Sequence, residues 1–217
     1  MIGVDDLSPV AQDYLKVIWS AVEWGDAPIT TKGLAARLGT TQANVSETVK
    51  RLAAQGLLEH RPYRPVVLTP LGERLARVMV RRHRLIETFL TEVLGYGWEE
   101  VHDDAELLEH AASERFLARL DAVLGHPRRD PHGDAIPDAD GGWTPVVAPL
   151  LAEARPGDHT VARISDDDPE RLVRLGGQGV APGVVLVVDD DGVVHVDRTP
   201  LALDAGDLAA IRVLPPS

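Results

Sequence analysis

Apolar residues recur at helical spacing through the first 124 residues, whereas short strand-like runs dominate after about residue 150. The first helix is predicted over residues 8–24, where Ser8 can act as the N-cap and Pro9 takes the first helical position. One face of this helix carries the apolar residues Tyr14, Leu15, Ile18, Trp19 and Val22. A second long helix is predicted over residues 70–94 and a third over 103–124.

A helix-turn-helix is predicted between the first two long helices. Residues 31–38 and 41–55 each show helical spacing, and Gly39 makes the tight turn between them. Two short strands are predicted next, over residues 57–60 and 66–69, and they would form a wing. The turn between the strands reads Arg61, Pro62, Tyr63, Arg64 and Pro65. Its arginines and tyrosine favour phosphate contact, and an ordinary polar hairpin is the alternative.

The rest of the chain predicts a small β-domain. Residues 125–145 form a loop rich in Pro, Gly and Asp, which marks a boundary or a long ordered connection. Three strand-like runs follow, VARISD, GVVLVVD and GVVHVD, with a helix predicted over 168–175. The expected fold class is mainly α with a small β C-terminal domain. Its parts are a winged helix-turn-helix (1–74), a helical metal-binding and dimerisation domain (75–145) and an SH3-like barrel (150–217).

Charge is unevenly distributed along the 217 residues. The net charge is −12, yet residues 1–76 hold 8 basic and 8 acidic side chains, so the predicted DNA reader is neutral. A neutral reader predicts modest non-specific DNA affinity. The chain has no cysteine and no apolar run long enough for a bilayer, and its start lacks the features of a signal peptide. We therefore expect a cytoplasmic protein without a membrane partner.

Metal-ligating residue types cluster after the wing. His83 and Glu87 lie four apart, and Glu106, Glu109 and His110 share another helical face, with His102 just before it. Asp13 adds a carboxylate on the polar side of the first helix. Charged residues at this spacing usually form a solvated helix face. The combination, however, provides a set of about six oxygen and nitrogen ligands suited to a divalent ion such as manganese or iron.

These motifs resemble the diphtheria toxin repressor family of metal-dependent regulators, which includes iron-dependent regulators and manganese transport regulators. The matching segments are QDYLKVIW, the winged helix, LTPLGERLA, RRHRLIETFL, VHDDAELLEHAAS, PHGDAIP and RPGDHTVARISDDD. The resemblance implies two metal sites per subunit. It assigns to the primary site the residues Asp13, Glu106, Glu109 and His110. It assigns to the ancillary site the residues His83, Glu87 and His102, with Asp167 and Glu170 from the SH3-like domain.

The resemblance also bears on the metal. Iron-type members carry methionine and cysteine where this chain has Asp13 and Glu106, and manganese-type members carry carboxylates there. Harder oxygen ligands favour Mn²⁺, with Fe²⁺ as the alternative. Lys16 stands where short manganese regulators have a glutamate, which argues against their binuclear arrangement.

The recognition helix predicts the DNA contacts. Short polar side chains near its start can reach base edges, and basic residues can contact phosphates. The candidates are Thr41, Gln42, Ala43, Asn44, Ser46, Lys50, Arg51 and Arg64. The protein is expected to bind palindromic double-stranded operator DNA as a homodimer, because the helices of residues 77–124 carry enough apolar surface for a two-fold interface.

The leading hypothesis is a manganese-dependent repressor of metal homeostasis genes. The alternatives are an iron-dependent regulator, a carboxylate-histidine metalloenzyme and a DNA-binding protein that needs no metal. The sequence shows no catalytic triad or phosphate loop, so we expect neither an enzyme nor a small organic substrate. The four tryptophans are interpreted as packing residues. The remaining histidines are interpreted as surface or loop residues: His60, His126, His132, His159 and His195.

Overall fold

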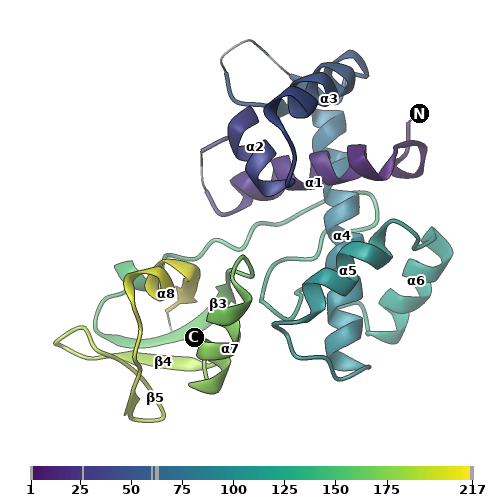
Figure 1. The fold of residues 1–217 in the computed structure, drawn as a ribbon. Helices are drawn as coiled ribbons and strands as arrows, with labels where there is room; N and C mark the ends of the chain where they lie inside the picture. The colour runs from purple at the N-terminus through teal and green to yellow at the C-terminus, as the bar shows by residue number, and fades with distance from the viewer. Residues whose placement is uncertain (1, 26, 60, 62–63, 216–217) are drawn as a thin grey trace. The chain divides into compact units, whose positions relative to one another are not determined.

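The structure, a computed structural model, describes residues 2–25, 27–59, 61 and 64–215 (Figure 1). The chain divides into two compact units. Unit 1 comprises Met1–His83 and Pro137–Thr144, and unit 2 comprises Arg84–Ile136 and Pro145–Ser217. The division falls inside the long helix α4, Pro70–Glu92. None of the helices within the described ranges is long and apolar enough to cross a membrane.

Unit 1 contains the predicted helix-turn-helix and wing. Its elements before α4 are a 3-10 turn Val4–Asp6, α1 Pro9–Glu23, α2 Thr31–Arg37, α3 Gln42–Ala54, β1 Leu58–Glu59 and β2 Val67–Leu68. Ser8, Thr30 and Thr41 cap the three helices through their side-chain oxygens, which confirms the helix starts. Strands β1 and β2 pair antiparallel, so the wing prediction is confirmed. The predicted wing residues His60, Pro62 and Tyr63 lie outside the described residues.

The core of unit 1 is closed by a segment that is distant in sequence. Leu15, Val49 and Leu52 are fully buried and hold α1 and α3 together. Residues 137–144 return to this core, where Trp143 meets Trp19 edge to face with the ring centroids 5.1 Å apart. Both tryptophans are thus packing residues, as expected.

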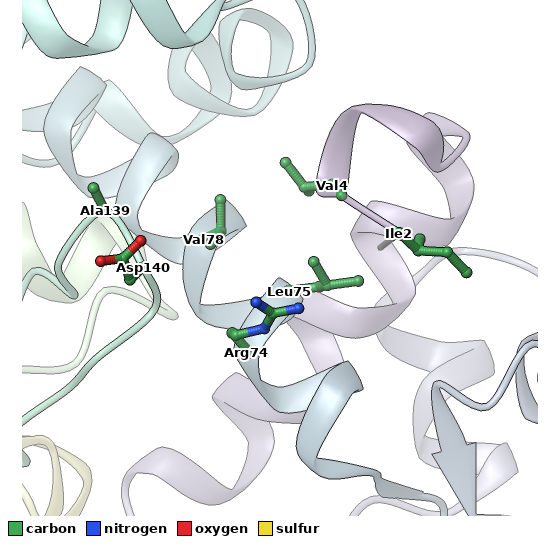
Figure 2. Close-up of a pocket in the computed structure, with 8 residues that line it drawn as sticks. Ile2, Val4, Arg74, Leu75, Val78, Ala139 and Asp140 are labelled. Carbon is green, nitrogen blue, oxygen red and sulfur yellow. The ribbon is translucent and has the colours of Figure 1, made fainter.

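A pocket of about 240 Å³ lies beside the same segment in unit 1 (Figure 2). Its apolar lining includes Ile2, Val4, Leu75 and Val78. Among the eight described residues that line it, Asp140 is the single metal-ligating side chain. The pocket therefore lacks the ligand set of a metal centre.

The helical part of unit 2 differs from the prediction of one helix over 103–124. It forms two helices, α5 Val101–Glu109 and α6 Glu114–Val123. The break arises because the Ser113 side chain accepts a hydrogen bond from the Phe116 amide at 3.3 Å and so caps a new helix. Apolar spacing continues across the break, and Val101, Ala105 and Leu117 share one core with the end of α4.

The remainder of unit 2 is the expected small β-domain. Its elements are a 3-10 turn Leu151–Glu153, β3 Gly157–Ile164, α7 Pro169–Gly177, β4 Val185–Val188, β5 Val194–Val196, β6 Thr199–Pro200, α8 Ala205–Ala210 and β7 Ile211–Leu214. The five strands form an antiparallel sheet in the order β6-β5-β4-β3-β7. Asp168 caps α7 through its side chain. The three predicted strands and the predicted helix are confirmed.

Residues 128–136 form a loop of unit 2 that contacts strand β3. The Ile164 amide of β3 donates to the His132 carbonyl at 2.9 Å. Gly133 has φ +89°, and a Cβ at this position would overlap the Ala162 carbonyl oxygen. Glycine is therefore required for the loop to approach β3 so closely. This contact places the end of β3 next to the polar groups described below.

Candidate metal centre and nucleic-acid interface

The recognition helix α3 presents the predicted contact residues to solvent. Val45, Val49 and Leu52 are fully buried on its inner face. Exposed positions in or near α3 include the predicted residues Thr41, Gln42, Ala43, Asn44, Lys50 and Arg51, and Arg64 of the wing turn is also exposed. Ser46 is half-buried, and its hydroxyl donates to the Gln42 carbonyl at 2.8 Å. The side-chain pattern thus suits a helix whose outer face is available to a ligand.

The acidic face of α5 separates into two parts. Glu109 ends the helix and is fully buried, and its Oε1 lies 3.8 Å from Nε2 of His110. Glu106 instead approaches His102, with 3.5 Å between its Oε1 and Nε2 of the imidazole. One turn of helix therefore serves two separate polar groups.

Two further predicted ligands belong to unit 1. Asp13 is half-buried on α1, and His83 is buried on α4, one turn before Glu87. Asp13 follows the N-terminal turn of α1, which Ser8 fixes by capping the helix.

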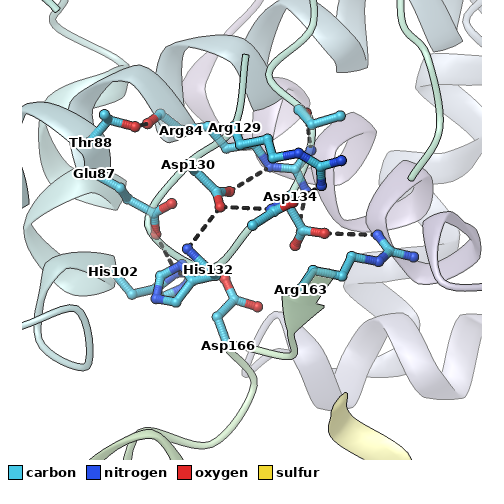
Figure 3. Close-up of polar contacts among 12 residues, drawn as sticks. Arg84, Glu87, Thr88, His102, Arg129, Asp130, His132, Asp134, Arg163 and Asp166 are labelled. Carbon is cyan, nitrogen blue, oxygen red and sulfur yellow. Dashed lines mark hydrogen bonds and ion pairs between the residues drawn. The ribbon is translucent and has the colours of Figure 1, made fainter. Parts of the chain in front are cut away.

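A buried group of metal-ligating side chains lies within unit 2 and consists of Glu87, Asp130 and His132 (Figure 3). One ligand atom from each lies within 4.8 Å of the others, and their exposures are 1%, 7% and 1%. The Asp130 carboxylate is held by the loop itself, since its Oδ1 accepts the amides of His132 and Asp134 at 2.9 Å each. Asp130 is therefore oriented by the backbone.

His132 meets the requirements for a metal ligand. Its Nε2 lies 2.8 Å from the Trp98 carbonyl, which can only accept, so Nε2 carries the proton. Nδ1 is then the unprotonated nitrogen of the neutral ring, and it is buried without a hydrogen-bond partner among the described residues. A backbone carbonyl that fixes the tautomer of a ligating histidine is a common arrangement. The Trp98 ring also stacks on the imidazole at a centroid distance of 5.8 Å.

A second, more accessible group shares Glu87. His102 Nδ1 lies 3.5 Å from Glu87 Oε1 and 3.9 Å from Asp166 Oδ2. The side chains of His102 and Asp166 are 46% and 36% exposed, whereas that of Glu87 is 1% exposed. Glu87 thus lies between a buried and a solvent-accessible set of ligands (Figure 3). A cation could enter from the side of His102 and Asp166.

The β-domain contributes Asp166 to this group. The neighbouring Asp167, which the resemblance selects, forms an ion pair with Arg171 at 2.7 Å and is 69% exposed. The Asp167 carboxylate also accepts the Ser165 hydroxyl at 2.8 Å. Glu170 lies exposed in the first turn of α7. Among these three acidic residues, Asp166 is the one placed with Glu87 and His102.

Sequence reasoning missed Asp130, His132 and Asp166. His132 lies in a loop, as expected, but not on the surface, because the 128–136 loop folds inward and buries its ring. His126 is 73% exposed, as expected. The available signal was the Asp-x-His spacing inside RDPHGDAIP. Helical spacing rules do not apply to a loop, so this spacing does not predict a pair of ligands.

Carboxylate crowding changes the proton affinity of the buried group. Burial raises the pKa of Asp130 to about 8, the Asp134 charge acts in the same direction, and Arg84 opposes both. For His132, burial by itself lowers the pKa, but the charges of Glu87, Asp130 and Asp166 outweigh it and raise the pKa. Because the unfolded pKa of Asp is near 3.9, the Asp130 contribution makes the metal-free fold less stable as the pH rises from about 4 to about 8.

Cation affinity of this group is expected to increase with pH until about pH 8, because Asp130 must lose its proton to ligate. Competition between the protein and a fluorescent Mn²⁺ indicator at pH 6, 7, 8 and 9 would measure it. From Asp130 alone we expect about tenfold per pH unit below 8 and little change above it. An Asp130→Asn variant should have a shallower slope. Affinity that is constant from pH 6 to 8 would contradict this assignment of the proton.

Comparison with known proteins places these features in a family. Residues 6–66 match the N-terminal DNA-binding domain of iron-dependent repressors, and residues 69–138 match their metal-binding and dimerisation domain. The iron-dependent repressor IdeR of Mycobacterium leprae is 33% identical over 86% of each chain. The diphtheria toxin repressor of Corynebacterium glutamicum is 31% identical over 96% of this chain and 97% of its own.

Comparison with solved structures gives the same family. A manganese-dependent transcriptional repressor in complex with manganese is 47% identical, with a TM-score of 0.87, over 94% of this chain and 99% of that one. ScaR with bound Zn²⁺ is 33% identical, with a TM-score of 0.80, over 94% of this chain and 99% of its own. A winged-helix reader combined with carboxylate and imidazole ligands defines a metal-dependent transcriptional repressor. The chain belongs to the diphtheria toxin repressor family. The resemblance is confirmed, and the metalloenzyme alternative is set aside because these relatives are repressors.

Proposed function

We propose that this repressor is manganese-dependent, binds palindromic operator DNA as a metal-loaded homodimer and controls metal homeostasis genes. The observation that carries the choice of metal is the buried group of Glu87, Asp130 and His132, which offers only oxygen and nitrogen ligands. The chain has no cysteine, so no thiolate can favour a softer metal. The manganese-dependent repressor that is 47% identical supports the same choice.

We propose two ions per subunit. The first is assigned, from the family resemblance, to Asp13, Glu106, Glu109 and His110. The second is assigned to Glu87 with His83 and His102, and the geometry of unit 2 supports adding Asp130, His132 and Asp166. For the carboxylate from the β-domain we favour Asp166 over Asp167 and Glu170, because Asp167 is engaged by Arg171 and Glu170 is exposed.

The DNA contacts are proposed on the outer face of α3 and on the wing. Base edges are assigned to Thr41, Gln42, Ala43, Asn44 and Ser46, and phosphates to Lys50, Arg51 and Arg64. Exposure of these side chains beside a fully buried inner face supports the assignment.

A two-fold interface is proposed on the helices of unit 2. Large apolar side chains are exposed there in unusual number for a monomer. They are Val93, Leu94, Leu107, Leu108, Phe116 and Val123, with exposures from 48% to 75%. Contact with the same surface of a second copy would bury them and would place two recognition helices on one operator.

The protein residues fit a divalent cation, and their roles follow from their charges. A bound divalent cation would supply positive charge that offsets the repulsion among these carboxylates. Glu109 and His110 hold ligand atoms at the end of α5, and Asp13 supplies a carboxylate from the helix that supports the DNA reader. Ligation by both sets would favour one orientation of the reader. A coupling of about 1–3 kcal/mol is typical of such linkage.

Metal titration of DNA binding tests the proposal. Fluorescence anisotropy of a labelled palindromic operator would be followed with chelator-treated protein at fixed salt, with Mn²⁺, Fe²⁺ and Zn²⁺ added separately. We expect binding to tighten at least tenfold with Mn²⁺. Equal operator affinity with and without metal would contradict metal control.

The same titration separates manganese from iron. The iron alternative is favoured by IdeR, an iron-dependent repressor that is 33% identical to this chain. Full activation by anaerobic Fe²⁺, with little activation by saturating Mn²⁺, would replace manganese with iron and leave the DNA-binding and dimer assignments unchanged.

A further inference from the structure

The 128–136 loop forms a chain of buried charges between α4 and β3 (Figure 3). Arg84 of α4 reaches Asp130 at 3.2 Å and Asp134 at 3.6 Å. Asp134 in turn accepts a 2.7 Å hydrogen bond from Arg163 of β3. Arg84, Asp134 and Arg163 are 7%, 3% and 2% exposed. Such groups require partners, because burial of an unpaired charge is costly.

We propose that Asp134 and Arg163 are positioning residues for the metal centre: their ion pair fixes the end of β3 so that Asp166 can join Glu87 and His102, beside Asp130 and His132. The inference rests on the proposed assignment of an ion to this group. It adds two residues that would not touch the ion and would act through the placement of Asp166.

The sequence distance makes this role possible. Asp166 follows Ile164, the last residue of β3, by two positions, and Arg163 immediately precedes Ile164. The Ile164 amide also donates to the His132 carbonyl, so strand and loop are joined at two neighbouring points just before Asp166. The side chain of Asp166 is itself 36% exposed. Its position therefore depends on where the strand ends rather than on packing around its own carboxylate.

The other ligands are held by contacts that do not include the Arg163 side chain. Asp130 is fixed by two loop amides, and His132 by the Trp98 carbonyl. Glu87 is part of α4. A change at Arg163 should consequently affect the ligand from the β-domain more than these three.

Arg163→Met is the appropriate test variant because Asp134 keeps Arg84 as a partner, which limits the cost to folding. Asp13→Asn would be present in all proteins, including the reference, to remove a ligand of the other proposed ion. Mn²⁺ binding would be measured by calorimetry and by electron paramagnetic resonance. We expect about tenfold to hundredfold weaker binding, as is typical when a supporting partner of a ligand is lost. Arg163→Lys should recover part of the affinity.

The deciding measurement is the same substitution with Asp166→Asn already present. If Arg163 acts through Asp166, Arg163→Met should then weaken Mn²⁺ binding less than twofold. A tenfold loss that persists without Asp166 would overturn the positioning role. So would unchanged binding in the single Arg163→Met variant.

Arg174→Met is the matched control. Arg174 of α7 pairs with the buried Asp207 of α8 in the same β-domain, so its loss tests general weakening of this domain. We expect Mn²⁺ binding in this variant to equal that of the reference. If Arg174→Met weakened binding as much as Arg163→Met, the proposal would fail. If the reference protein showed no ion at the Glu87 group, the proposed metal assignment itself would fail.

Discussion

A Glu87→Gln variant is expected to lose Mn²⁺ binding at the buried group and with it much of the metal-dependent operator affinity. Glu87 belongs to both ligand groups of unit 2, so one substitution removes a charge from each. The amide retains the shape of the side chain but supplies a much weaker ligand for a hard cation. We expect a loss of about 100-fold or more, since even supporting residues contribute 10-fold to 100-fold.

The same variant separates metal loss from misfolding. Glu87 is among the charges that raise the pKa of Asp130, so its neutralisation relieves repulsion between these two carboxylates in the metal-free state. Metal-free Glu87→Gln should therefore unfold at or above the reference temperature. At Mn²⁺ near 100 times the reference Kd, ligand stabilisation at this group is about 2.7 kcal/mol, and a 100-fold weaker variant would keep about 0.4 kcal/mol. Calorimetric melting with and without Mn²⁺ would measure this difference.

Glu92→Gln provides the control for that experiment. Glu92 is the last residue of α4 and is exposed, so the same chemical change occurs on the same helix without affecting the ligand groups. Its melting shift with Mn²⁺ should match that of the reference. If Glu87→Gln retained the full shift, the assignment of the ion to this group would be wrong.

Local signals explain why most of the fold could be predicted from the sequence. Ser8, Thr30 and Thr41 each precede a helix and accept a backbone amide within the first turn, which is information contained in a few neighbouring residues. The break between α5 and α6 was missed because apolar spacing continues across it. Ser113 carried the signal for that break, but a single serine within a periodic segment is compatible with a continuous helix.

Spacing along the chain predicted the candidate metal ligands mainly where they share a helix. His83 and Glu87 are one turn apart on α4, and this spacing is visible in the sequence. Asp130, His132 and Asp166 come from a loop and from the end of a strand, and their approach to Glu87 depends on tertiary contacts such as the Ile164 amide with the His132 carbonyl. No periodicity relates residues 87, 132 and 166. The family resemblance implies Asp167 and Glu170, in the same segment of the β-domain as Asp166, which is the acidic residue placed with Glu87 and His102.

The Arg84→Met substitution is expected to lower the free energy of unfolding strongly. Arg84 pairs with Asp130 and Asp134 and donates to the Ala135 carbonyl at 2.7 Å, all in buried surroundings. Removing one partner of a buried ion pair typically destabilises a protein by about 3–5 kcal/mol. Asp134 would keep Arg163, so the main uncompensated charge would be on Asp130.

The pH dependence of this loss identifies its cause. The pKa of Asp130 is about 8 with Arg84 present, and Arg84 lowers it, so Arg84 stabilises only the ionised carboxylate. The destabilisation by Arg84→Met, measured by urea unfolding of metal-free protein, should therefore be larger at pH 9 than at pH 6. Arg77→Met is the control on the same helix, since Arg77 lies 3.9 Å from the half-exposed Glu73 and such pairs contribute about 0–1 kcal/mol. Equal losses at the two pH values would mean that Arg84 stabilises the 128–136 loop through its ion pair with Asp134, its bond to the Ala135 carbonyl and its packing, and not through the Asp130 charge.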